Sequence, residues 1–188
     1  GWHSDYCQQC DPCHSGDHNL CGAAQGTIIG RHGGFAQTVR ADATAVVALP
    51  DGMDLSLAGP LFCGGITVFN PLVQFNIKPT DKVAVIGIGG LGHMAVKLAV
   101  AMGAEGTVIS RSDEKEQEAK ALGAKGILVS KDADAMKAAE QSFDFILDTV
   151  PVQHDCTPYT SLLDIDGSLV IVGQIGPMEM SMAMPLVF

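Results

Sequence analysis

Four cysteines near the beginning of the chain are spaced as metal ligands. They stand two, two and seven residues apart, at Cys7, Cys10, Cys13 and Cys21. Two-residue gaps let successive thiolates turn around one centre. The longer excursion brings a fourth thiolate to complete the tetrahedron that Zn²⁺ prefers in structural sites. The intervening residues are loop formers without apolar periodicity, so the metal itself would hold residues 1–21 together. The pattern predicts a closed structural zinc site.

Two other arrangements of this cysteine lobe are conceivable. The four cysteines allow three pairings as two disulfides. The rest of the chain is typical of an intracellular α/β enzyme, in which thiols stay reduced, and this favours zinc and a cytoplasmic location. The histidines His3, His14 and His18 could replace a thiol, but four thiolates already fill a tetrahedral site.

A glycine-rich turn between a predicted strand and a predicted helix is the second feature that could do chemistry. A β-branched run at 82–86 leads into it, and residues 93–102 follow with apolar side chains at helical spacing. The turn consists of Gly87, Ile88, Gly89, Gly90, Leu91 and Gly92. In this context G-x-G-x-x-G is typical of a dinucleotide site, because glycines let the backbone approach a pyrophosphate at the helix N-terminus. The alternative is an ordinary tight turn.

The end of the next predicted strand, at 106–110, indicates which dinucleotide binds. An NAD site usually has an Asp or Glu there to bond the ribose 2′-hydroxyl. This chain has Ser110, followed by Arg111, Ser112 and Lys115. Hydroxyls and a guanidinium bind a 2′-phosphate through charge-assisted hydrogen bonds, whereas a carboxylate would repel it. The sequence therefore predicts NADP, unless these cations only face solvent at the start of a helix.

Strands and helices alternate over the rest of the chain, which predicts an α/β fold with a doubly wound parallel Rossmann sheet. The predicted strands are 82–86, 106–110, 126–129, 143–148 and 168–172, and the predicted helices are 93–102, 112–122, 133–140 and 158–163. Upstream, 33–40 and 45–50 are expected to be β segments and 54–70 a helix. Because ligands bind beyond the carboxyl ends of parallel strands, we expect Thr149, Val150, Val172 and Gly173 to line the cofactor cleft.

Charge and hydropathy exclude two classes of partner. The chain has 11 Lys and Arg against 21 Asp and Glu, a net charge of −10 at pH 7, which suits neither nucleic acid nor an anionic membrane. Gly, Pro or charged residues interrupt its apolar stretches before the ~18–20 residues that a membrane span needs. We expect no nucleic-acid or membrane partner.

Taken in order, four motifs resemble the zinc-dependent medium-chain alcohol dehydrogenases. They are the cysteine lobe, Gly-Gly-Phe-Ala at 33–36, Cys-Gly-Gly-Ile-Thr-Val at 63–68 and the glycine turn. The likeness is greatest to the cinnamyl alcohol dehydrogenase-like branch and its bacterial broad-specificity aldehyde reductases. It covers essentially the whole chain and implies part of a GroES-like catalytic domain over 1–78 and a Rossmann NADP-binding domain, lacking its last strand, over 79–188.

The resemblance also implies an activity and further site residues. The activity is zinc- and NADP-dependent hydride transfer between small primary alcohols and aldehydes, in a homodimer. By spacing alone Cys63 is a core residue, but the resemblance implies that it binds the catalytic zinc and that Thr67 contacts the nicotinamide side. Ser110, Arg111, Ser112 and Lys115 match the positions that hold the 2′-phosphate. Cys156 is expected only to pack.

The motifs that would supply the other catalytic zinc ligands are absent, so we interpret the chain as a fragment that is inactive alone. Two alternatives remain. The chain could be a non-catalytic, zinc-stapled NADP-binding module, because one ligand does not hold an open catalytic zinc. Its parent could also be a zinc-dependent polyol dehydrogenase of the same superfamily.

Overall fold

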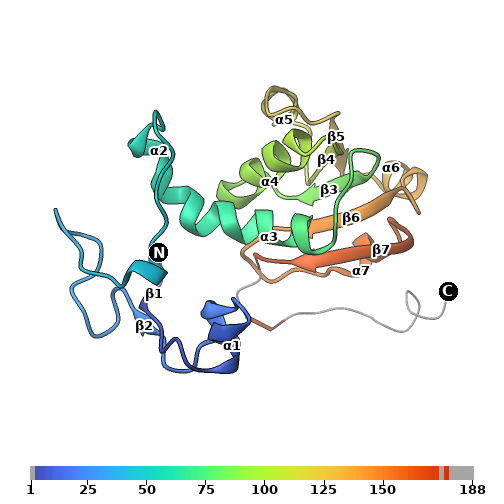
Figure 1. Cartoon of the computed structure of the whole chain (residues 1–188). Coiled ribbons are helices and arrows are strands. Elements are labelled where there is room, and N and C mark those ends of the chain that lie inside the picture. The colour runs from blue at the N-terminus through green and yellow to red at the C-terminus, as the bar shows by residue number, and fades with distance from the viewer. Residues whose placement is uncertain (1–2, 174–175, 178–188) are drawn as a thin grey trace. The chain divides into compact units, whose positions relative to one another are not determined.

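A computed structural model describes residues 3–173, 176 and 177, and the chain forms two compact units, residues 1–62 and 63–188 (Figure 1). In the sequence, the boundary between the two units lies between residues 62 and 63, upstream of the expected junction between residues 78 and 79. The reason is that helix α3 (Ile66–Gln74) buries Val68 and Leu72 in the core of the second unit. The boundary between a GroES-like and a Rossmann domain stays a prediction.

The second unit is built on a five-stranded parallel sheet in the order β5-β4-β3-β6-β7, which confirms the predicted Rossmann fold. The strands are β3 (Lys82–Ile86), β4 (Glu105–Ser110), β5 (Ile127–Val129), β6 (Phe143–Asp148) and β7 (Leu163–Ile171). The chain runs outward from β3 through β4 to β5 and then returns to the other side of β3 as β6. The strand order therefore reverses between β3 and β6, which is where doubly wound sheets bind ligands.

Helices cover both faces of this sheet and explain the continuous apolar runs of its central strands (Figure 1). Val83 and Val85 of β3 point to the face that carries α3, α4 and α5, whereas Ala84 and Ile86 point to the face that carries α6 and α7. The bounds of these helices are α4 (Gly90–Ala101), α5 (Glu116–Ala121), α6 (Ala133–Ala138) and α7 (Thr157–Thr160).

Several predicted boundaries in this unit are wrong. The helix expected at 93–102 begins at Gly90, and the one expected at 158–163 ends at Thr160. The two largest differences are at the start of a helix and the start of the last strand. The helix expected from residue 112 begins at Glu116, because the polar run Arg-Ser-Asp-Glu has no apolar side chain to pack and its Ser and Asp compete for backbone hydrogen bonds. The last strand begins at Leu163 and not at 168, since Leu163 pairs with Phe143. Its first half, Leu-Asp-Ile-Asp, alternates apolar and polar residues, which is a short strand pattern that the prediction missed.

A continuous helical stretch runs from Leu55 to Gln74 and joins the two units. It consists of α2 (Leu55–Pro60), a π-helical turn (Leu61–Gly65) and α3, and it starts at the predicted position because the Asp54 side chain accepts the backbone N–H of Ser56. The expectation that Gly and Pro interrupt this apolar segment is wrong. Pro60 lacks a backbone N–H, and the helix continues past it through the wider π turn.

This stretch meets the simplest criteria for a membrane span. It has 20 residues and a mean hydropathy of 1.4, and among the described residues it is the one helix that is long and apolar enough. A single helix of this kind is weak evidence of a span, because core helices of soluble proteins meet the same criteria.

The first unit has little regular structure. Strand β1 (His3–Asp5) pairs antiparallel with β2 (Gln25–Gly26), and helix α1 (Asp11–His14) lies between them in the sequence. The β segments predicted at 33–40 and 45–50 are wrong, since neither range is a strand. A strand requires a neighbouring strand for its backbone groups, and no strand among the described residues pairs with either range. Phe35 and Val47 are accordingly 96 % and 73 % exposed.

Candidate zinc lobe and dinucleotide-binding edge

The four cysteines of the lobe converge as predicted. Their sulfurs all lie within 4.8 Å of one another, and all four are free thiols. The Cys13 sulfur is 4.0 Å from that of Cys7 and 3.5 Å from that of Cys10. A tetrahedral zinc with bonds of about 2.3 Å separates its sulfurs by about 3.8 Å, so the cluster has the dimensions of a zinc site. Helix α1 positions Cys10 and Cys13, and Cys21 follows a 3₁₀ turn.

The pKa values of two lobe thiols are shifted in opposite directions. The backbone N–H of Gln9, which donates to the Cys7 sulfur, is the main cause that lowers the pKa of Cys7 to about 6. Burial is the main cause that raises the pKa of Cys13 to about 12. One thiol therefore ionises readily while another resists ionisation beside it. A central divalent ion would favour the thiolate form of all four cysteines, and the residues fit a structural zinc.

The glycines of the dinucleotide turn divide into two kinds. Gly87 has φ +83°, a backbone conformation that favours glycine, and a Cβ on Gly92 would overlap the carbonyl oxygen of Gly87. The fold itself requires these two. A Cβ on Gly89 or Gly90 would instead meet nothing within 4 Å. Open space thus lies at the N-terminus of α4, where backbone N–H groups attract a pyrophosphate.

The other two residues of the turn serve the core. The side chain of Ile88 is buried and that of Leu91 is partly buried, and both pack against the cluster between the sheet and α4. Their side chains are therefore not directed at a ligand, and any contribution to binding would come from their backbone.

Gly92→Ala is expected to destabilise the second unit by about 2–3 kcal/mol, because the added methyl group forces the strand–helix turn apart. Gly90→Ala is the matched control: its methyl group enters open space at the start of α4, so stability should stay equal or rise by up to ~1 kcal/mol. Urea unfolding of both variants measures the difference. Equal stabilities would contradict the assigned close approach.

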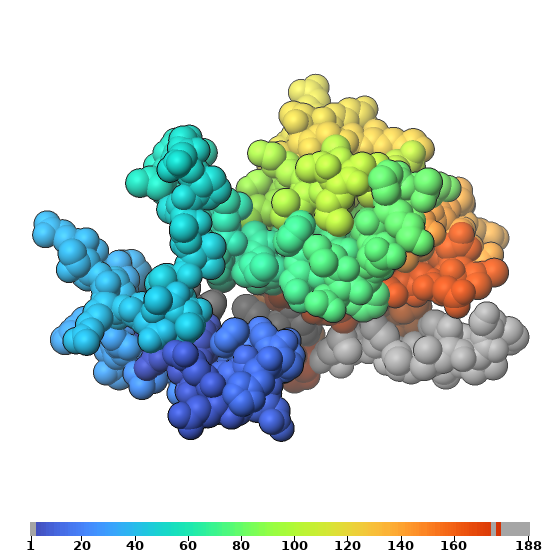
Figure 2. Space-filling view, viewed as in Figure 1, coloured from blue at the N-terminus to red at the C-terminus, as the bar shows by residue number. Residues whose placement is uncertain are grey.

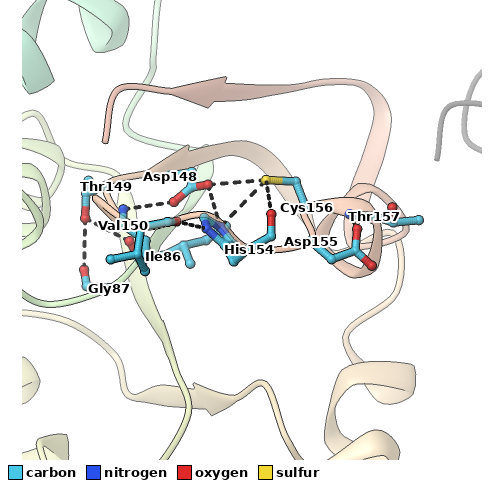
Figure 3. A network of polar contacts seen from close by, with 10 residues as sticks. Ile86, Gly87, Asp148, Thr149, Val150, His154, Asp155, Cys156 and Thr157 are labelled. Atoms are coloured by element: carbon cyan, nitrogen blue, oxygen red, sulfur yellow. Dashed lines mark hydrogen bonds and ion pairs between the residues drawn. The ribbon is translucent and has the colours of Figure 1, made fainter. Parts of the chain in front are cut away.

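The ends of β6 and β7 meet the glycine turn at the same edge of the sheet. Thr149 is buried, and its hydroxyl donates to the Ile86 carbonyl at 2.8 Å and lies 3.3 Å from the Gly87 carbonyl (Figure 3). A Cβ on Gly173 would overlap the backbone of Thr149, and the Val172 N–H donates to the Asp148 carbonyl at 2.9 Å. The predicted residues converge here, but the Thr149 hydroxyl is engaged with the turn, so Thr149 acts as a positioning residue.

The predicted 2′-phosphate residues lie at the end of β4, with Ser110 as its last residue, and in the loop after it. Strand β4 neighbours β3. The Gly87 N–H donates to the Ile109 carbonyl at 2.9 Å, so Ser110 comes directly beside the turn. Arg111 is exposed and makes no hydrogen bond or ion pair with any residue that the structure describes. Lys115 lies 3.9 Å from Glu118 in an exposed pair of little strength. Ser112 is half-buried in the loop between them. The side chains of Arg111 and Lys115 are therefore available to an anionic ligand.

Cys63 and Thr67 lie on the helical stretch that packs against α4. A Cβ on Gly64 would touch Leu91 and Met94 at 3.3 and 3.4 Å, so the π turn contacts the first turns of α4. Figure 2 shows the green surface of α3 beside the yellow-green surface of α4. Cys63 is exposed and Thr67 half-buried. Within the described part of the chain, no group of three metal-binding side chains includes Cys63, and its role as a ligand stays a prediction.

The sequence analysis missed one cluster, formed by Asp148, His154 and Cys156. Cys156 is buried, as its expected packing role requires, but its sulfur also contacts the other two side chains. Burial, and to a lesser degree the Asp148 charge, raises the pKa of Cys156 to about 11. The available signal was a His-x-Cys spacing six residues after an acid at the end of a strand.

Comparison with known proteins decides the family. Residues 90–188 match the sequence model of the family "Zinc-binding dehydrogenase", and residues 1–51 match that of the "Alcohol dehydrogenase GroES-like domain". The chain belongs to the zinc-binding dehydrogenases. This confirms the predicted family and the combination of Rossmann and GroES-like folds. Among similar proteins is the aldehyde reductase AdhA of Synechocystis sp., 51 % identical over 175 residues, with 93 % of this chain and 52 % of the relative covered.

Cinnamyl alcohol dehydrogenases are also similar in sequence and structure. A probable cinnamyl alcohol dehydrogenase of Zea mays is 44 % identical over 190 residues, covering 96 % of this chain and 52 % of the relative. The structure of SbCAD4 from Sorghum bicolor matches with a TM-score of 0.85 at 38 % identity, covering 100 % of this chain and 56 % of that chain. The CAD of Helicobacter pylori complexed with NADP(H) matches with a TM-score of 0.80 at 30 % identity, covering 94 % and 54 %. The chain spans about half the length of these relatives.

Proposed function

We propose that the chain is part of a zinc- and NADP-dependent oxidoreductase that interconverts primary alcohols and aldehydes. The observation that carries the proposal is the free Arg111 beside Ser110, with no acid at this strand end, next to open space at the glycine turn. The AdhA relative, named an aldehyde reductase, and the cinnamyl alcohol dehydrogenases support the substrate class.

In this proposal NADP lies across the carboxyl edge of the sheet. The pyrophosphate occupies the open space at Gly89 and Gly90, and Ser110, Arg111, Ser112 and Lys115 bind the 2′-phosphate. Gly173 and Val172 line the cleft beside the turn that Thr149 supports, and Thr67 contacts the nicotinamide side. When bound, the nicotinamide accepts or gives the hydride. The NADP(H) complex of the Helicobacter pylori CAD supports this choice of cofactor.

Two zinc ions have different roles. The closed four-thiolate site leaves no coordination position for a substrate, so it is structural. Cys63 is one ligand of a catalytic zinc, whose other ligands come from chain outside these 188 residues. When bound, that zinc supplies Lewis-acid polarisation of the alcohol or aldehyde oxygen. Four reduced thiols suit the cytoplasm, and we place the enzyme there as a homodimer.

One observation each supports the two alternative functions named in the sequence analysis. A non-catalytic NADP-binding module is supported by the absence, among the described residues, of further ligands around Cys63. A polyol dehydrogenase is supported by the match to galactitol-1-phosphate dehydrogenase from Escherichia coli, with a TM-score of 0.75 at 27 % identity.

An assay of NADPH-dependent aldehyde reduction separates these functions. The 188-residue chain should bind NADPH without turnover, whereas a polypeptide extended to the length of the relatives should reduce cinnamaldehyde. Cys63→Ser in the extended enzyme should lower the rate at least ~100-fold, because loss of a ligand exceeds the effect of outer-shell changes. An extended protein that oxidises only polyols, or turns over nothing while it binds NADPH, would overturn the proposal.

A further inference from the structure

A buried carboxylate at the end of β6 faces two side chains that are potential metal ligands (Figure 3). One oxygen of Asp148 accepts the backbone N–H of Val150 at 3.0 Å. The other, Oδ2, lies 2.9 Å from Nε2 of His154 and 3.5 Å from the sulfur of Cys156. Asp148 and Cys156 are fully buried, whereas the His154 side chain is 19 % exposed.

The hydrogen bond on the far side of the imidazole fixes its tautomer. Nδ1 of His154 lies 2.8 Å from the carbonyl oxygen of Val152, which can only accept, so Nδ1 carries a hydrogen. In a neutral imidazole, Nε2 then presents a lone pair to the Asp148 carboxylate. Two acceptors at 2.9 Å require a positive charge between them, either a proton or a metal ion. Metal-binding histidines commonly donate their other N–H to a backbone carbonyl in this manner.

The third side chain has the spacing of a third zinc ligand. The Cys156 thiol donates to Oδ2 of Asp148 at 3.5 Å, and its sulfur lies 3.6 Å from Nε2 of His154. Tetrahedral zinc, with bonds of about 2.0 Å to N and O and 2.3 Å to S, separates its sulfur from either atom by about 3.5 Å. The N-to-O distance is a few tenths of an ångström shorter than zinc needs. The three atoms thus form one face of a zinc tetrahedron.

We propose that Asp148, His154 and Cys156 form a further zinc site, apart from the lobe and the catalytic zinc, with a water molecule as the fourth ligand on the solvent-facing side of His154. It lies in the second unit and is distinct from the cysteine lobe. Zinc binds here as the thiol of Cys156 gives up its proton, together with any proton shared by Asp148 and His154, to solvent. The site does not depend on the proposed enzymatic function.

A bound zinc ion would join the two ends of the loop 148–156, which lies beside the glycine turn. Asp148 begins this loop, Cys156 ends it at the N-cap of α7, and Val150 within it would touch a Cβ on Gly87 at 3.1 Å. Zinc would therefore stabilise the second unit by an amount that rises with the logarithm of its concentration above the dissociation constant, since the folded loop alone brings the three ligands together.

Calorimetric titration of Zn²⁺ into the 188-residue chain, with its lobe already holding one zinc, tests the proposal. One further zinc per chain is expected. Cys156→Ser and His154→Gln should each weaken it at least ~10-fold. The matched controls are Cys63→Ser, which removes the other thiol outside the lobe, and His93→Gln, whose Nδ1 also faces a backbone carbonyl, that of Gly89 at 3.2 Å. Both controls should bind the second zinc as the unmodified chain does.

The absorption spectrum of the cobalt-loaded chain is a second test, and in the unmodified chain it does not depend on the stability of any variant. Co²⁺ added to the chain with its lobe zinc-filled should produce sulfur-to-cobalt absorption in the near ultraviolet, and Cys63→Ser should retain it. Circular dichroism checks that each variant is folded. No second equivalent of zinc, no sulfur-to-cobalt band in the unmodified chain, or equal zinc binding by folded Cys156→Ser would overturn the site and leave a shared proton as the explanation.

Discussion

Cys10→Ser is expected to unfold the cysteine lobe, which the structure describes over residues 3–21, while the sheet of the second unit stays folded. Among the described residues of the first unit, the buried apolar side chains are Cys13, Cys21 and Ala58, so the lobe has no apolar core apart from two of its own ligands. Zinc binding supplies about 10–16 kcal/mol of folding free energy in comparable zinc-held peptides. Loss of one ligand removes enough of it to release the lobe.

Hydrogen exchange and metal analysis measure this effect. The backbone amides of His14 and Cys21, which donate to Cys10 and His18 carbonyls, should exchange at least ~1000-fold faster in the variant, equal to about 4 kcal/mol. The zinc that the lobe holds should be lost. Cys63→Ser, a thiol outside the lobe, should change neither. Unchanged protection in Cys10→Ser, or disulfides among the four cysteines of the folded chain, would refute the structural zinc.

Ser110→Asp combined with Arg111→Ile is expected to reverse the cofactor preference. The new carboxylate accepts the ribose 2′-hydroxyl and repels a 2′-phosphate, and the second change removes the guanidinium. Charge-assisted hydrogen bonds of this kind contribute about 1.5–3 kcal/mol each, less when exposed. NADH should then bind at least ~10-fold more tightly than NADPH, as measured by direct titration of both.

Lys125→Ile is the matched control for the loss of a cation. Lys125 precedes β5 at the opposite end of the sheet, where it pairs with Glu105 at 2.8 Å. Its loss removes the same charge and should leave the preference for NADPH unchanged. A similar loss of preference in the control would mean that net charge, and not the local site, selects the cofactor.

The sheet could be predicted because its strands carry their own signal. Strand β3 is an apolar run after Lys82, and β6 carries the apolar run 145–147. Both runs are buried, and a glycine or a threonine follows each strand. The segments at 33–40 and 45–50 carry similar apolar residues, but a strand depends on a partner that sequence periodicity does not show. The π turn after Pro60 was also unpredictable, since it resolves a local conflict between a proline and an otherwise helical segment.

The parts of the candidate site that could be predicted are those formed by residues close together in the sequence. The cysteine lobe and the glycine turn are local motifs, and the structure brings their residues together. The engagement of the Thr149 hydroxyl with the Ile86 carbonyl spans 63 residues and depends on the pairing of β3 with β6. The cluster of Asp148, His154 and Cys156 depends on the path of the loop after β6, for which periodicity gives no signal.

Titration of NADPH and NADH into the unmodified chain, at low and at physiological ionic strength, tests the central claim most directly. NADPH is expected to bind about 10- to 100-fold more tightly than NADH, because Arg111, Lys115 and the two serines engage the 2′-phosphate. The difference should shrink as salt rises, since exposed charges are screened. NADH binding that is equal to or tighter than NADPH binding at low ionic strength would contradict it.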